Sequence, residues 1–135
     1  MVKIYTDGSQ TQICFVIEGQ EPIVRPVKPD GERATVNEGE YLAVIHALQE
    51  AKNQGLQEVE VWSDSELMVK QMTEGKDGRA KYQTKEIRLQ QLQALVRGLM
   101  VNVKATFNWL PREQNLAGLV LEQEEKKKRR THVSI

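Results

Sequence analysis

Three acidic residues, Asp7, Glu40 and Asp64, lie where strand-like and helix-like segments begin or end. Asp7 closes the segment VKIYTDG, Asp64 follows EVEVW, and Glu40 lies near the start of the amphipathic segment between them. Carboxylates gathered without basic partners repel one another and take up protons unless a hard divalent cation lies between them. If the fold brings the three together, the chemistry that they suit is Mg²⁺ binding.

Each acid also has a structural explanation when it is taken alone. Asp7 and the glycine after it are typical of a hairpin turn. Glu40 lies three residues after Asn37, which is the spacing of a helix-capping box. Asp64 precedes a helix-like segment, where an acid is stabilised by the positive end of the helix dipole. The case for function therefore depends on all three acids together.

Hydrophobic periodicity and turn signals indicate which elements would position these acids. Strands are expected at 2–8, 12–19, 21–27, 58–64 and 101–110, and helices at 38–55, 65–75, 84–100 and from about Asn115 onward. The first three strands have hairpin spacing, whereas a helix separates the third strand from the fourth. We therefore expect one α/β domain with a five-stranded mixed sheet, three antiparallel strands and then two parallel ones, flanked by helices.

This topology predicts where the acids meet. A right-handed crossover places the carboxyl ends of parallel strands at one edge of the sheet, where open α/β sheets tend to bind ligands. Asp7 and Asp64 are expected at such ends, and Glu40 lies in the first turn of the helix that connects their strands. The three carboxylates are thus expected at one edge.

Composition limits the class of protein. The chain has 135 residues and 39% apolar content, which suits one compact domain. It has no apolar run of the roughly 20 residues that cross a bilayer and no signal-like start, so we expect a cytoplasmic monomer with no membrane contact and no small-molecule cofactor. The single cysteine, Cys14, lies in the apolar run ICFVI and is expected to pack as a small hydrophobe.

Charge is balanced overall, with 19 basic and 19 acidic residues, but it is uneven along the chain. The run KKKRR at 126–130 holds five of the basic residues, so the rest has 14 basic against 19 acidic residues. We divide the chain into a domain at 1–125 and a basic tail at 126–135. The tail is open to three interpretations: a phosphate-binding segment, a nuclear-import signal, or a solvated, frayed end.

Three segments resemble a known family. YTDGS at 5–9, TVNEGEYLAVIHAL at 35–48 and VWSDSELMVKQM at 61–72 are similar to the signature segments of type 1 ribonuclease H, in the short form that lacks the basic protrusion. The order of elements agrees up to about residue 122. The resemblance implies a ribonuclease H-like fold and cleavage of the RNA strand of an RNA/DNA hybrid. It also implies two Mg²⁺ or Mn²⁺ ions and products with 3′-hydroxyl and 5′-phosphate ends.

The resemblance also implies roles for individual residues. Asp7 would bridge both metal ions, and Glu40 and Asp64 would hold the ion on the leaving-group side. Two such ions activate a water and neutralise charge on the attacking and departing oxygens. The residues expected to bind substrate are Gly8, Ser9, Thr35, Asn37, Ser65, Gln71, Arg112 and Asn115.

Among these residues, the backbone at Gly8 and Ser9, together with Glu40, would meet 2′-hydroxyls, which distinguish RNA from DNA. Thr35 and Asn37 would touch the DNA strand, and Gln71 would reach the minor groove. Capping is the alternative role for Asn37 and Gln71. The basic surface would come from Lys76, Arg79, Lys81 and Lys85 with the KKKRR run, so we expect binding to be weak and salt-dependent.

The chain departs from the family at the fourth acid. An aspartate is expected four residues after the asparagine that matches Asn115, yet Leu119 stands there, or Gly118 if one residue is deleted. Neither side chain binds metal, and the missing acid would serve the ion that activates water. Glu122 is the best substitute, because it shares the helix face under either alignment and lies one turn later.

Two other points remain open in this last segment. Glu113 is a weaker candidate for the fourth ligand, and the absence of any fourth ligand is the third alternative. The histidine usual in the family's mobile loop has no counterpart between Trp109 and Asn115, and Arg112 is the nearest polar residue, placed to contact the cleaved phosphate or simply the solvent. A module that binds hybrid or RNA without turnover is therefore the alternative to an active enzyme.

Overall fold

The computed structural model describes residues 1–73 and 84–133, and it has the predicted order of elements. The elements are β1 (Val2–Gly8), β2 (Gln12–Ile17), β3 (Ile23–Pro26), α1 (Val36–Asn53), β4 (Glu58–Ser63), α2 (Glu66–Met72), α3 (Ile87–Met100), β5 (Lys104–Trp109), the short 3₁₀ helix η1 (Arg112–Gln114) and α4 (Leu116–Val133).

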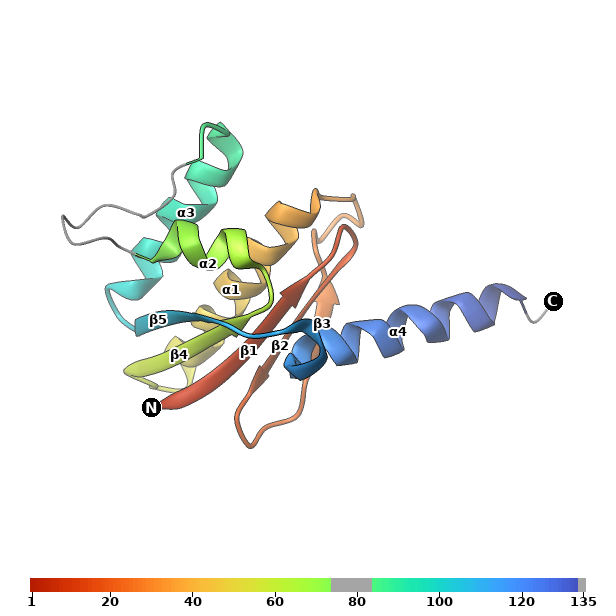
Figure 1. The fold of residues 1–135 in the computed structure, drawn as a ribbon, viewed down its shortest axis with the longest axis horizontal. Helices are drawn as coiled ribbons and strands as arrows, with labels where there is room; N and C mark the ends of the chain where they lie inside the picture. The colour runs from red at the N-terminus through yellow and green to blue at the C-terminus, as the bar shows by residue number, and fades with distance from the viewer. Residues whose placement is uncertain (74–83, 134–135) are drawn as a thin grey trace.

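The strands form one five-stranded sheet in the order β3-β2-β1-β4-β5. β1 pairs antiparallel with β2, and β2 pairs antiparallel with β3, whereas β4 is parallel to both β1 and β5. The predicted mixed sheet is confirmed. β1 lies at its centre, so residues at the end of β1 can be reached from helices on both faces (Figure 1).

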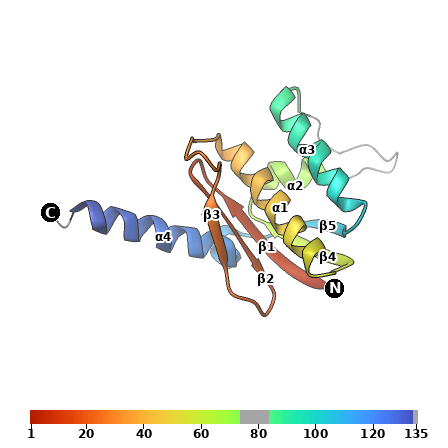
Figure 2. The ribbon, with the colours of Figure 1, turned by 180° about the vertical axis from the view of Figure 1, so that it is seen from behind.

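Helices cover the two faces unequally. Helices α1, α2 and α3 lie on one face, over a core that includes Ile4, Phe15, Leu48 and Val61. Helix α4 packs on the opposite face against β1 and β2, over a smaller cluster of Cys14, Val16, Ala117 and Leu121. Figure 2 shows α1 and α4 on opposite sides of the sheet. Because α4 is the described helix that packs on this second face, its first turns fix what lies beside β1.

Cys14 belongs to that smaller cluster and is fully buried, as predicted. Burial, aided by the charges of Asp7 and Glu124, raises the pKa of its thiol to about 12. A thiol with such a pKa stays protonated near neutrality and is a poor nucleophile. The side chain therefore serves packing.

The first turn of α1 differs from the predicted cap. Thr35, not Asn37, is the N-cap: its Oγ1 accepts from the Glu38 N–H at 3.1 Å, and Glu38 Oε1 accepts from the Thr35 N–H at 3.4 Å. The capping box begins two residues earlier than expected because Thr35 and Glu38 have the same spacing as Asn37 and Glu40. Glu40 is thus released from capping and lies on the buried side of the helix.

The hairpin between β1 and β2 also differs from the prediction. Asp7 and Gly8 are not turn residues, because both belong to β1 and pair with Cys14 and Ile13. The turn is made by Ser9, whose Oγ accepts from the backbone N–H groups of Thr11 and Gln12 at 3.2 and 3.0 Å. The serine hydroxyl supplies the local bonds expected of Asp7. The carboxylate of Asp7 is thereby left for another role.

The end of β1 touches the start of α1 at two glycines. A β-carbon on Gly8 would lie 2.0 Å from the carbonyl oxygen of Gly39, and one on Gly39 would lie 2.3 Å from the carbonyl oxygen of Ser9. Neither distance is compatible with a side chain, and both obstacles are backbone atoms. The two backbones are therefore in direct contact because both residues are glycine.

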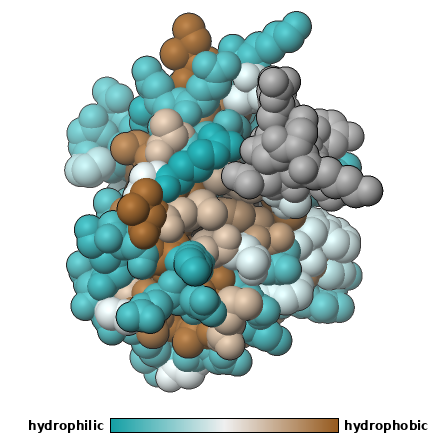
Figure 3. Space-filling view, turned by 90° about the vertical axis from the view of Figure 1, so that its left-hand side faces the viewer, coloured by the Kyte–Doolittle hydropathy of each residue, from teal (hydrophilic) through white to brown (hydrophobic). Residues whose placement is uncertain are grey.

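The basic run at 126–130 belongs to α4, which extends to Val133, so this segment is helical. The C-terminal half of the helix extends away from the sheet (Figure 1). On the opposite side, around α3 and β5, apolar and hydrophilic surface are interspersed (Figure 3). Among the described helices, none combines the length and apolar character needed to span a membrane.

Replacing Gly39 with alanine is expected to lower the free energy of unfolding by roughly 1–3 kcal/mol, because the added methyl group meets the Ser9 carbonyl. The matched control is Gly98→Ala in α3, where a β-carbon would meet nothing within 4 Å. That change should leave stability unchanged or raise it by up to about 1 kcal/mol. Urea unfolding followed by circular dichroism compares them. Equal stabilities for the two variants would contradict the role of the glycine contact.

Candidate active site

The three predicted acids meet at one edge of the sheet. Asp7 lies at the end of β1, Asp64 directly follows β4, and Glu40 lies near the start of α1. Each offers a carboxylate oxygen, and these oxygens all lie within 4.8 Å of one another. Asp7 and Glu40 are buried, and Asp64 is half-buried. The structure therefore brings together the set that strand topology predicted.

The donor set suits a divalent cation. Within the described part of the chain, the buried oxygens Glu40 Oε2 and Asp64 Oδ2 accept no hydrogen bond. A buried acceptor without a partner is costly, and a bound cation would satisfy it. Carboxylate oxygens are the ligands that Mg²⁺ and Mn²⁺ prefer. The residues present thus fit a hard divalent metal ion.

Electrostatics give the same indication. Burial, followed by the charge of Asp64, raises the pKa of Asp7 from 3.8 to about 6. Burial and the charges of Asp7 and Asp64 raise the pKa of Glu40 well above its usual range. Burial also raises the pKa of Asp64, although the charge of Arg112 and a hydrogen bond from Asn115 oppose this. Without a cation, the cluster retains protons near neutrality.

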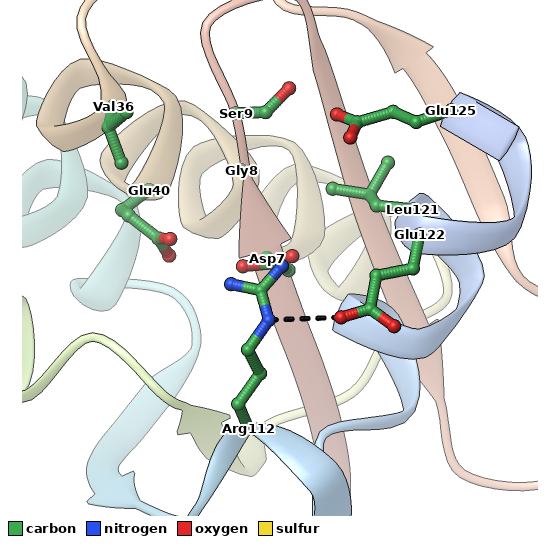
Figure 4. A pocket seen from close by; sticks show the side chains of 9 residues that line it. All are labelled: Asp7, Gly8, Ser9, Val36, Glu40, Arg112, Leu121, Glu122 and Glu125. Carbon is green, nitrogen blue, oxygen red and sulfur yellow. Dashed lines mark hydrogen bonds and ion pairs between the residues drawn. The ribbon is translucent and has the colours of Figure 1, made fainter. Parts of the chain in front are cut away.

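Two of the three acids, Asp7 and Glu40, line a pocket of about 220 Å³ (Figure 4). Its lining residues are Asp7, Gly8, Ser9, Val36, Glu40, Arg112, Leu121, Glu122 and Glu125. The guanidinium of Arg112 reaches in front of Asp7 from the loop after β5, and Glu122 and Glu125 approach from α4 (Figure 4). The pocket is therefore predominantly acidic, with Arg112 as its cationic lining residue among those described.

Gly118 is the residue of α4 that faces the acids. A β-carbon at this position would lie 3.4 Å from Asp7 Oδ2 and 3.5 Å from Asp64 Oδ2. Leu119, by contrast, is 38% exposed. Of the two positions considered for the missing aspartate, the structure places Gly118 beside the cluster.

The candidate substitutes for that aspartate are farther from the acids. Glu122 lies in the pocket wall, but its Oε1 accepts from Arg112 Nε at 3.1 Å, and it is not a member of the three-acid group. Glu113 lies in η1 and is exposed. Neither residue reaches the cluster in this structure, and ligation by Glu122 stays a prediction.

Comparison with known proteins shows the family. A family model described as reverse transcriptase-like matches residues 27–121. The RNase H1 of the halophilic archaeon Halobacterium salinarum NRC-1 is 25% identical, with a TM-score of 0.73 over 86% of this chain and 89% of that chain. LC11-RNase H1, isolated from compost by a metagenomic approach, is 30% identical, with a TM-score of 0.69 over 84% of this chain and 86% of that chain. The chain belongs to the type 1 ribonuclease H family.

A second structure of LC11-RNase H1 is in complex with an RNA/DNA hybrid. It is 28% identical to this ribonuclease H chain, with a TM-score of 0.71 over 86% of this chain and 89% of that chain. No curated protein matches the sequence. The fold and the arrangement of the strands thus agree with the family predicted from the three motifs.

Some expected substrate-binding residues of this ribonuclease H lie at the pocket. Gly8, Ser9 and Arg112 line it directly. Thr35 and Asn37 are exposed at the start of α1, close in sequence to Val36 of the pocket lining. Four of these five residues are at least partly exposed to solvent, whereas Gly8 is buried.

Others make internal bonds. Ser65 caps α2, with its Oγ accepting from the Met68 N–H at 3.3 Å. Gln71 is buried, and its side-chain oxygen accepts from Tyr41 and Gln93. These bonds belong to the domain's interior, so contact of Gln71 with a minor groove stays a prediction and would require this network to open.

Asn115 is fully buried and joins α4 to β1. Its Nδ2 donates to the Thr6 carbonyl at 3.0 Å, and its Oδ1 accepts from the Ala117 N–H at 3.2 Å. These bonds hold the start of α4 beside Asp7. A structural role is thus visible for this residue, whereas its expected role in substrate binding stays a prediction.

The expected basic surface is only partly visible. Lys85 is exposed, whereas Lys76, Arg79 and Lys81 lie outside the described residues. In the last helix, Lys126 is exposed and lines a neighbouring pocket with Arg112, Glu122 and Glu125. The start of the basic run is thereby placed beside the acidic pocket.

Sequence reasoning missed Trp109 and Glu125. Trp109 ends β5, is 49% exposed, and donates from Nε1 to the Asp64 carbonyl at 3.3 Å. Its position in the sequence could have predicted this, because Trp109 ends a strand that is parallel to the strand before Asp64. Glu125 could have been predicted from helical periodicity, because it lies seven residues after Gly118 and thus on the same face of the helix.

The raised pKa of Asp7 predicts that the free energy of unfolding depends on pH. The folded protein binds protons more tightly than the unfolded chain, so stability falls as pH rises from about 4 to about 6, by roughly 2–3 kcal/mol. In EDTA at about pH 7.5, Asp7→Asn should therefore melt at a higher temperature than the wild type. The difference should shrink toward pH 4.

Metal should reverse this difference. Added Mg²⁺ or Mn²⁺ should raise the melting temperature of the wild type at about pH 7.5 and raise that of Asp7→Asn much less, because ligation needs the ionised carboxylate. Thermal unfolding followed by circular dichroism, with and without EDTA, provides the measurement. An Asp7→Asn protein that melts below the metal-free wild type at about pH 7.5 would show that the cluster carries no such repulsion.

Proposed function

We propose that the protein is an endoribonuclease that hydrolyses the RNA strand of RNA/DNA hybrids with divalent metal ions. The observation that carries this proposal is the convergence of Asp7, Glu40 and Asp64 within 4.8 Å at the sheet edge. Two buried oxygens of this set accept no hydrogen bond among the described residues. The family and the hybrid complex of LC11-RNase H1 support the choice of substrate.

By resemblance to the family, Asp7 would help to hold both of two Mg²⁺ or Mn²⁺ ions. Glu40 and Asp64 would hold the ion on the leaving-group side. When bound, such ions activate water and neutralise charge on the departing oxygen. The buried walls around Asp7 and Glu40 would limit water and strengthen these electrostatic effects.

Other pocket residues would orient the substrate. The backbone at Gly8 and Ser9 lies beside Asp7 and Glu40, where it would meet a 2′-hydroxyl of the RNA strand. The guanidinium of Arg112 has the charge and geometry to hold a phosphate through two parallel hydrogen bonds. Positioning of the phosphate by Arg112 thus complements the acids, which cannot attract it themselves.

Glu122 is the proposed fourth ligand, on the side of the ion that activates water. It lines the same pocket as Asp7, one helical turn after Gly118. To reach that ion its carboxylate must give up the Arg112 hydrogen bond at 3.1 Å. Both side chains are partly exposed, at 41% for Glu122 and 62% for Arg112, so this exchange requires no opening of the core.

The alternative is a module that binds hybrid or RNA without turnover. Gly118 favours it, because the helix position closest to Asp7 and Asp64 has no side chain to bind metal. Such a module would keep the fold and the pocket but would not activate water. Cleavage assays separate the two functions directly.

In the cleavage assay, purified protein is incubated with a labelled RNA/DNA hybrid and Mg²⁺ or Mn²⁺. The wild type should release fragments with 3′-hydroxyl and 5′-phosphate ends, and Asp7→Asn or Asp64→Asn should abolish cleavage. Glu58→Gln, an exposed acid on β4, is the control for the loss of one negative charge. Equal cleavage by the wild type and Asp7→Asn would point to a contaminating nuclease, and no cleavage with intact hybrid binding would support the alternative.

Glu122→Gln tests the fourth ligand separately. Loss of its negative charge should reduce hybrid cleavage sharply while the protein still folds, because Glu122 is partly exposed and its side chain bonds to Arg112, which is itself exposed. Initial rates across a range of Mg²⁺ concentrations provide the measurement. Wild-type rates in this variant would remove Glu122 from the mechanism.

A further inference from the structure

Gly118 leaves a gap in the ring of acidic side chains. A β-carbon built on Gly118 would point toward both Asp7 and Asp64 and would make ordinary van der Waals contact with their Oδ2 atoms at 3.4 and 3.5 Å. A β-carbon is therefore accommodated here without moving the backbone. A carboxylate at this position would join the three-acid cluster from the α4 side.

On the same side of the cluster, the Arg112–Glu122 ion pair takes the place of a fourth acid. Glu122 Oε1 accepts from Arg112 Nε at 3.1 Å, and the guanidinium lies in front of Asp7 (Figure 4). The pair thus occupies the nearest available carboxylate and sets a positive charge beside the acids. Both properties disfavour another cation there.

The two sides of the site are consequently unequal. A first ion between Asp7, Glu40 and Asp64 meets three carboxylates and two unpartnered buried oxygens. A second ion on the α4 side would share Asp7 and would need Glu122, which must first leave a guanidinium that itself repels the ion. Charge and ligand availability therefore oppose the second ion and favour the first.

We propose that Gly118 and the Arg112–Glu122 ion pair together weaken the second of two divalent-ion sites, so that the protein fills its active site in two steps of unequal affinity. This inference rests on the metal site of the proposed function but not on its substrate. Hybrid cleavage would then continue to rise with the free metal concentration after the first site is full, because the second site fills only at higher concentrations.

Mn²⁺ titration of the full chain at about pH 7.5, with free Mn²⁺ followed by its electron paramagnetic resonance signal, measures both affinities. The wild type should bind one ion at least about tenfold more tightly than the second. Gly118→Asp should tighten the second ion by at least about tenfold, whereas Gly118→Ala, which fills the same space without a ligand, should bind like the wild type.

Arg112→Gln tests the ion pair with a substitution at an exposed side chain. It should tighten the second ion severalfold by releasing Glu122 and removing the positive charge. Lys126→Gln is the matched control, because Lys126 lines the neighbouring pocket and the same charge is lost while the Arg112–Glu122 pair remains. This control should change the second affinity less than twofold. Thermal unfolding establishes that each variant is folded.

The proposal is overturned if the wild type binds two ions with equal affinity, or if a folded Gly118→Asp or Arg112→Gln protein binds like its control. If Gly118→Asp does not fold, the comparison of Arg112→Gln with Lys126→Gln still decides. The titration contains no nucleic acid. A wild-type chain that binds Mn²⁺ in two unequal steps but does not cut hybrid would therefore reject the proposed function and leave this inference intact.

Discussion

The backbone contact between Gly8 and Gly39 is the constraint on which the site depends. It joins the end of the central strand to the first turn of α1 at a distance that leaves no room for a β-carbon on either residue. Asp7 and Glu40 are the neighbours of these glycines in sequence, so the same contact sets the spacing of their carboxylates. Packed backbone thus holds these two acids close together.

The second face of the sheet completes the site by a different interaction. Asn115 is fully buried and bonds to the Thr6 carbonyl, one residue before Asp7, so the start of α4 is fixed relative to β1. Ala117 and Leu121 then pack over Cys14 and Val16. This packing turns Gly118 toward Asp7 and Asp64. Because Gly118 has no side chain, it leaves space beside the acids on that face of the sheet.

The sequence predicted the mixed sheet and the convergence of three acids because both follow from periodicity and from the geometry of parallel crossovers. It misplaced the cap of α1, because Thr35 and Asn37 have equivalent spacing to a glutamate and only the packed helix distinguishes them. Two features of the site depend on helix rotation and side-chain direction. One is which of Gly118 and Leu119 faces the acids, and the other is the Arg112–Glu122 pair. Those are set by tertiary packing that local sequence does not encode.

Gly118 also affects both the stability of the metal-free fold and the affinity of the site for metal ions. Burial already raises the pKa values of Asp7 and Glu40, so a fourth buried carboxylate would add repulsion to the cluster whenever no cation is bound. The glycine removes that cost, and Arg112 adds a positive charge that favours the ionised forms of Asp7 and Asp64. Gly118 and Arg112 also disfavour a second cation. The same two residues therefore stabilise the metal-free fold and weaken the binding of the second ion.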